Sequence, residues 1–148
     1  MRNERGFSLT ELLIVVAIIG IIAAIAVPNL LQSKADANEA SAISSMRNLV
    51  SSQITYSATT GAGTYATSLG SLSTSKLIDS VLGSGTKDGY TFSISTGTGN
   101  TTFSLKARPQ TYGSTGTRSF FADESYVIRY NTGNAEADSA SPPLGKTS

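Results

Sequence analysis

A long apolar run near the start of the chain limits what the chain can fold into. From Phe7 to Val27 there are 21 residues, and only Glu11 among them is ionisable. As a helix rising ~1.5 Å per residue, the run would measure roughly 31 Å, which matches a bilayer hydrocarbon core of about 30 Å. We therefore expect a membrane-spanning helix. Arg2 and Arg5 on its flank predict that this end stays in the cytoplasm. A carboxylate in such a run is costly, so we interpret Glu11 as functional.

The helical pattern continues beyond Pro28 and ends near residues 59–61. An apolar stripe recurs at helical spacing, with Leu49 and Gln53 beside it, and comprises Ile43, Met46, Val50 and Ile54. Four charged residues fall mostly off this stripe, namely Lys34, Asp36, Glu39 and Arg47. The remaining residues are few for an independent core, so the second half of the helix should form one wall of the globular head.

About four strands are predicted in the last third of the chain. Residues 90–95 and 102–108 alternate between apolar and polar side chains, and 118–122 and 126–130 form a second pair around the turn at 123–125. Short turns between them favour an antiparallel sheet. One sheet face should pack on the helical stripe, and it carries Tyr90, Phe92, Ile94, Phe103, Leu105 and Ile128. We also expect a short helical turn at 75–82 and a polar tail from Asn131 that is either draped over the head or loose. The predicted fold class is α+β, a long N-terminal helix packed against an antiparallel sheet.

Composition argues against most kinds of chemistry. The formal net charge is +1, and removal of residues 1–6 would leave nine cationic and nine anionic side chains, so no nucleic-acid partner is predicted. Without histidine or cysteine there is no Ser-His-Asp triad, thiol nucleophile or disulfide. We expect a non-enzymatic protein with no cofactor and no metal site. The carboxylates of the head are interpreted as solvated turn residues, namely Asp123, Glu124, Glu136 and Asp138.

Three residues at the start of the apolar run carry a family resemblance. Gly6, Phe7 and Glu11, placed directly before a membrane-length segment, resemble the processing site and anchor of type IV prepilins and of the related type II secretion pseudopilins. The resemblance implies cleavage between Gly6 and Phe7 by a prepilin peptidase and N-methylation of the new Phe7 amine. It also implies that Glu11 pairs with the Phe7 amine of a neighbouring subunit during assembly. An alternative is an interfacial carboxylate that pairs within its own chain.

The resemblance divides the chain into a leader peptide at 1–6, a hydrophobic transmembrane and assembly helix at 7–30, an amphipathic half of the helix at 31–60 and a globular head at 61–148. Gly20 and Pro28 mark positions of helix flexibility, because Gly20 is permissive and Pro28 lacks an N–H for the carbonyl of Ala24. Gly20 and Ala24 also form a small-xxx-small pair that lets another helix approach.

The function this implies is that of a structural subunit of a type IV pilus-like filament. Its expected partners are copies of itself in a helical filament, the prepilin peptidase and N-methyltransferase, and an inner-membrane assembly platform. It would lie in the bacterial inner membrane as a single-pass protein before assembly, and afterwards in an extracellular pilus or a periplasmic pseudopilus. The alternatives are a type II secretion pseudopilin, a membrane-anchored binding protein that does not polymerise, an anchor that is never cut, and a secretory signal cleaved after Ala24-Ile25-Ala26.

Overall fold

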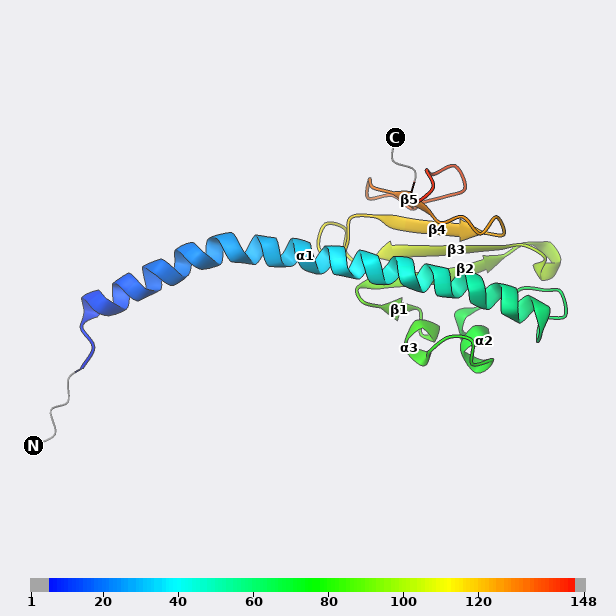
Figure 1. Ribbon diagram of the computed structural model, residues 1–148, viewed down its shortest axis with the longest axis horizontal. Coiled ribbons are helices and arrows are strands. Elements are labelled where there is room, and N and C mark those ends of the chain that lie inside the picture. Colours follow the sequence, from blue (N-terminus) through cyan, green and yellow to red (C-terminus); the bar gives the residue numbers. More distant parts are fainter. Residues whose placement is uncertain (1–5, 146–148) are drawn as a thin grey trace, which may run out of the picture. The chain divides into compact units, whose positions relative to one another are not determined.

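The computed structural model describes residues 6–145, and its dominant element is the helix α1, Leu9–Ala58 (Figure 1). The helix continues through both Gly20 and Pro28, as the sequence predicts, and ends within three residues of the predicted limit. The molecule divides into two compact units, one ending at Ser33 and the other beginning at Lys34. The second half of α1 therefore belongs to the same unit as the head.

The head contains two short helices and one antiparallel sheet. Its elements in chain order are α2 (Leu69–Thr74), α3 (Ser80–Gly83), β1 (Thr86–Lys87), β2 (Tyr90–Thr96), the 3-10 turn Thr98–Asn100, β3 (Phe103–Pro109), β4 (Ser119–Asp123) and β5 (Arg129–Asn131). The strands lie in the order β1-β2-β3-β4-β5, and every neighbouring pair is antiparallel. The α+β fold predicted from the sequence is confirmed.

Three local predictions differ from the structure. The sheet has five strands rather than about four, because β1 has only two residues and no alternation to reveal it. The helical turn predicted at 75–82 is present only over its last residues, as α3. A second short helix, α2, precedes 75–79, and the two helices have separate N-caps, Ser68 and Asp79. The last strand begins at Arg129 instead of Tyr126, because Tyr126 has a φ of 61°, which ends extended backbone.

The core lies between α1 and the inner face of the sheet. Met46 and Leu49 of α1 are fully buried, and they belong to the same cluster as the predicted sheet residues Tyr90, Phe92, Phe103 and Leu105. Phe120 and Ala122 of β4 complete this face, because they lie in register with Ala107 and Leu105. The predicted stripe is wrong at Ile54, which is 43% exposed, whereas Gln53 is buried and binds both the N–H and the carbonyl of Ala66.

The polar tail is draped over the outer face of the sheet. The hydroxyl of Ser119 on β4 donates to the carbonyl of Ala135 at 2.7 Å and accepts the N–H of Ala137 at 2.9 Å. Under this cover Phe121 is only 7% exposed, although its neighbours in register point to the outer face. The structure thus decides between the two alternatives that the sequence left open for the tail.

Candidate functional site

The segment around the start of α1 is open to solvent. Gly6, Phe7 and Ser8 lie outside the helix, which begins at Leu9. The Phe7 side chain is 84% exposed, and a Cβ built on Gly6 would meet no atom within 4 Å. The Gly6–Phe7 peptide bond is therefore accessible and non-helical, as a protease substrate has to be.

Ser8 and Glu11 form a reciprocal pair of hydrogen bonds at the helix start. The backbone N–H of Ser8 donates to Oε2 of Glu11 at 2.9 Å, and the backbone N–H of Glu11 donates to Oγ of Ser8 at 3.2 Å. This is a capping box, in which two of the unpaired N–H groups of the first turn are satisfied by side chains. This role of Ser8 is not among the predictions above, although the spacing Ser-x-x-Glu before an apolar run is the signature of a capping box.

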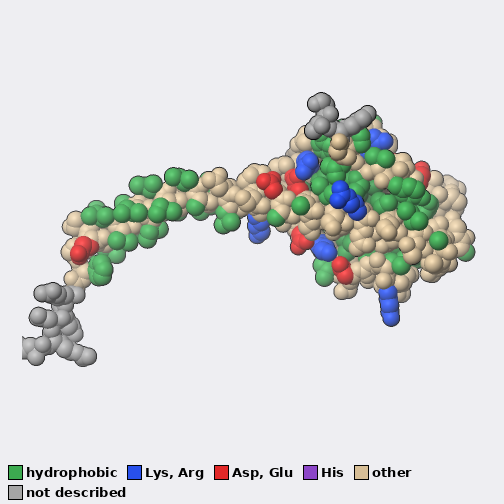
Figure 2. Space-filling model, viewed as in Figure 1, with side chains coloured by type: hydrophobic (Ala, Val, Ile, Leu, Met, Phe, Trp, Pro, Cys, Tyr) green, Lys and Arg blue, Asp and Glu red, His purple; other side chains and the backbone are tan. Residues whose placement is uncertain are grey.

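The apolar side chains of the first half of α1 lie on the surface of the molecule. Figure 2 shows them gathered along this half of the helix, and between Leu9 and Leu31 each large one is at least 47% exposed. By length and composition α1 qualifies as a membrane-spanning helix, with a mean hydropathy of 2.8 over 18 residues and none of that window buried. A secretory signal near an N-terminus meets the same criteria, so family comparison has to decide between the two.

The two positions of predicted flexibility are both helical. At Gly20 a Cβ would meet nothing within 4 Å, so no contact inside the described chain requires a glycine there. At Pro28 the helix continues without the hydrogen bond that a proline cannot donate.

Glu39 joins α1 to the loop before β4, a role that the sequence analysis also missed. It was placed mostly off the buried stripe, and the structure shows that this was wrong, since Glu39 is 4% exposed. Its carboxylate accepts four hydrogen bonds from Thr117 and Arg118, including 2.7 Å from the Arg118 Nε. Burial alone would raise the pKa of Glu39, but the bonds from Thr117 and Arg118 outweigh burial and hold its pKa below the usual 4.5.

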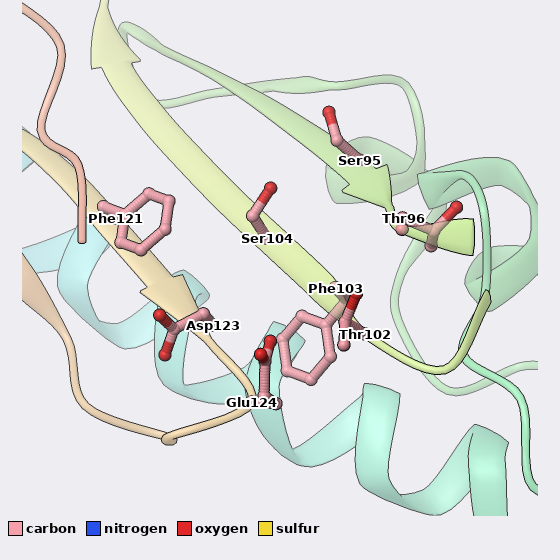
Figure 3. A pocket seen from close by; sticks show the side chains of 9 residues that line it. Ser95, Thr96, Thr102, Phe103, Ser104, Phe121, Asp123 and Glu124 are labelled. Carbon is pink, nitrogen blue, oxygen red and sulfur yellow. The ribbon is translucent and has the colours of Figure 1, made fainter. Parts of the chain in front are cut away.

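The carboxylates of the head do not assemble into a metal site. Among the described residues no group of three or more His, Cys, Asp or Glu side chains could hold an ion. Asp123 and Glu124 line an open groove of about 380 Å³ beside the ends of β2 and β3 (Figure 3), where Asp123 accepts hydrogen bonds from Ser125. Glu136 is not simply solvated as predicted, because it forms salt bridges with Lys106 at 2.8 Å and Arg108 at 3.4 Å.

Comparison with known proteins concerns the same amino-terminal segment. Residues 1–27 match the family described as the prokaryotic N-terminal methylation motif. In this segment the chain is similar to type IV pilins and to a type II secretion pseudopilin.

Three curated proteins are similar to the chain over this segment. The chain is 59% identical over 39 residues to the type IV wide pilus major component PilA4 of Thermus thermophilus, 47% identical over 51 residues to the type IV major pilin protein PilA of Myxococcus xanthus, and 42% identical over 43 residues to the type II secretion system core protein G of Dickeya chrysanthemi. These matches cover 26%, 34% and 29% of the chain and 30%, 23% and 28% of the relatives' own lengths. No solved structure matches.

The pilin motif spans Gly6, Phe7, Glu11 and Gly20, but Pro28 lies beyond it. The resemblance stated from the sequence is confirmed, and so is the architecture of a long apolar helix with an antiparallel sheet. Hydropathy alone does not separate an anchor from a signal, and the match to the N-terminal methylation motif fits a membrane anchor. The head has to be understood from its own structure, because the relatives match over less than a third of their length.

Proposed function

We propose that the chain is a structural subunit of a type IV pilus-like filament, freed by cleavage between Gly6 and Phe7 and methylated on Phe7. The observation that carries the proposal is the first half of α1, in which every large apolar side chain is exposed and the one carboxylate lies at the start of the helix. Outside a bilayer such a surface needs another apolar environment, and copies of the same helix supply one. A head-to-tail contact that does not close gives an open helical filament.

In this proposal Glu11 and Phe7 set the axial stagger between subunits. Cleavage turns the Phe7 N–H into a cationic amine, and a carboxylate among packed apolar helices is costly unless a cation lies beside it. Pairing of the Glu11 carboxylate with the Phe7 amine of a second copy relieves this cost in one register only. Gly20 and Pro28 are the positions at which we expect the helix to adjust within the filament.

A second candidate is the pseudopilin of a type II secretion system, favoured by the similarity to the secretion core protein G. Both candidates require the same processing and the same anchor. The peptidase, an inner-membrane assembly platform and the inner membrane itself are partners under either. They differ in the location of the product, which is an extracellular pilus in the first case and a periplasmic pseudopilus in the second.

The test is the intact mass of the mature protein together with its distribution after cells are sheared. A mass that begins at Phe7 with one added methyl group, and recovery in sheared fibres, are expected for a pilin. The same mass without surface fibres indicates the pseudopilin. A chain that begins at Val27 indicates ordinary secretion, and retention of Met1 indicates an uncut anchor, and either result contradicts the proposal.

A further inference from the structure

The capping box uses only part of the Glu11 carboxylate. Its Oε2 accepts the Ser8 N–H, whereas its Oε1 has no hydrogen-bond partner among residues 6–145. A carboxylate has two oxygens and about four acceptor positions, so one oxygen can be bound locally while the other receives a cation. A pairing within the chain and a pairing with a second copy are therefore compatible.

We propose that Ser8 is a positioning residue for filament assembly: its capping box holds the Glu11 carboxylate in one orientation and leaves Oε1 for the Phe7 amine of a second copy. This inference rests on the proposed function. The box uses only the N–H and Oγ of Ser8 and the N–H and carboxylate of Glu11. None of these groups is lost when the Gly6–Phe7 bond is cut, so the box is available in the processed chain.

The physical reason is the cost of ordering a flexible side chain. Without the Ser8 hydroxyl, the Glu11 N–H returns to the unpaired groups of the first turn, and that turn frays. The carboxylate then has to be fixed at the moment of assembly, which subtracts from the free energy of association. With the box intact, this ordering is complete before two copies meet.

Four variants of the full chain separate the box from the charge. Ser8→Thr keeps a capping hydroxyl, and Ser8→Val is its near-isosteric control without one. Ser8→Ala removes the hydroxyl with the smallest side chain. Glu11→Gln keeps a capping-box side chain but removes the charge that an amine would recognise.

The first measurement is the ratio of fibre-associated protein to processed protein, with processing scored by intact mass. Loss of an N-cap changes an equilibrium constant about fivefold. Ser8→Val and Ser8→Ala should therefore lower the ratio roughly fivefold, and Ser8→Thr should keep it at the parent value. Counting processed chains alone keeps any effect on cleavage out of the ratio. Glu11→Gln should lower the ratio as well, although its box is retained.

The second measurement is amide hydrogen exchange at residue 11 of the full chain in detergent micelles. Exchange should be roughly fivefold faster in Ser8→Val and Ser8→Ala than in the parent, and unchanged in Ser8→Thr and Glu11→Gln. This readout depends on neither cleavage nor polymerisation. It reports whether the box exists, and the fibre ratio reports whether assembly uses it.

The inference requires Ser8→Thr and Ser8→Val to differ in both the exchange rate at residue 11 and the fibre ratio. Equal exchange in the two variants would mean that there is no box to act. Different exchange with equal fibre ratios would mean that the box is only structural, and either outcome overturns the role of Ser8 while the filament proposal stands. Absence of fibres and pseudopili from the parent chain overturns the filament proposal itself, whatever the exchange rates show.

Discussion

At the scale of single residues, Glu39 is the main surprise of the head. It lies seven residues before Met46 and four before Ile43, so helical spacing places it on the face that meets the sheet. The general tendency of acidic residues to be exposed argued against that position. The exception holds because Thr117 and Arg118 satisfy the carboxylate, and the Arg118 guanidinium also lies 5.6 Å from the centre of the Tyr130 ring.

We predict that Glu39→Gln destabilises the head by about 2 kcal/mol at neutral pH, because charge-assisted bonds to a buried carboxylate are lost. The midpoint of thermal unfolding, followed by circular dichroism on the detergent-solubilised chain, should fall by roughly 10 °C. The exposed Glu124→Gln is the matched control and should leave the midpoint unchanged.

The effect of Glu39→Gln should also depend on pH. The folded-state pKa of Glu39 is lowered, so its contribution to stability is complete above the unfolded-state pKa of about 4.3 and is lost as the pH falls through the folded value. The difference between parent and variant should therefore narrow below about pH 4. A difference that stays constant down to pH 2 would contradict the role assigned to the charge.

At the scale of elements, the two halves of α1 lie in different environments. Its second half is held by the core, whereas its first half buries none of its large apolar side chains in the described chain. Gly20 lies in this first half, and the space around it is open. Glycine weakens a helix by about 1 kcal/mol relative to alanine, and no contact within the described chain compensates for this at Gly20.

We predict that Gly20→Ala stabilises the isolated helix by up to about 1 kcal/mol and lowers fibre yield. The added methyl group hinders close approach of another helix and resists local unwinding, and either effect opposes assembly. Helicity in detergent micelles and the sheared-fibre fraction should be measured on the same preparations. Undiminished fibre yield would show that Gly20 serves neither purpose.

At the scale of the whole molecule, the head is completed by segments far apart in sequence. Its core takes Ala42, Met46, Leu49 and Val50 from α1, and the tail is hydrogen-bonded to Ser119 on the outer face of β4. Ala137 of the tail is 1% exposed, although the tail as a sequence is small and polar. The tail therefore belongs to the folded structure of the head.

We predict that Ala137→Leu destabilises the head by about 1–3 kcal/mol, because three carbons have to fit into a filled site. Ala140→Leu adds the same atoms to an exposed position of the tail and is the matched control. Unfolding in urea, followed by the fluorescence of the head tyrosines, measures both. Equal midpoints for the two variants would mean that the tail is not packed in solution.

The sequence by itself determined the elements whose signals are local. A membrane-length apolar run, the spacing of Gly6-Phe7 and Glu11, and the alternation in β2 and β3 are each visible in a short stretch of sequence. The short strand β1 and the boundaries of α2 and α3 were not predicted, because two to six residues carry too little periodicity. In the candidate site, the capping box of Ser8 could have been predicted from the Ser-x-x-Glu spacing. The assembly roles proposed for Phe7 and Glu11 were inferred from family resemblance.

Only the tertiary structure decided what the head buries. It placed Glu39 inside and Ile54 outside, folded the tail onto β4, and gave Glu136 two cationic partners. The placements of Glu39, the tail and Glu136 each depend on a residue at least 16 positions away. Burial of a polar group is favourable only when it has a hydrogen-bond partner, and for Glu39 that partner is distant in sequence. Local periodicity does not show which distant residue will be the partner, so only the folded structure shows which of these side chains are buried.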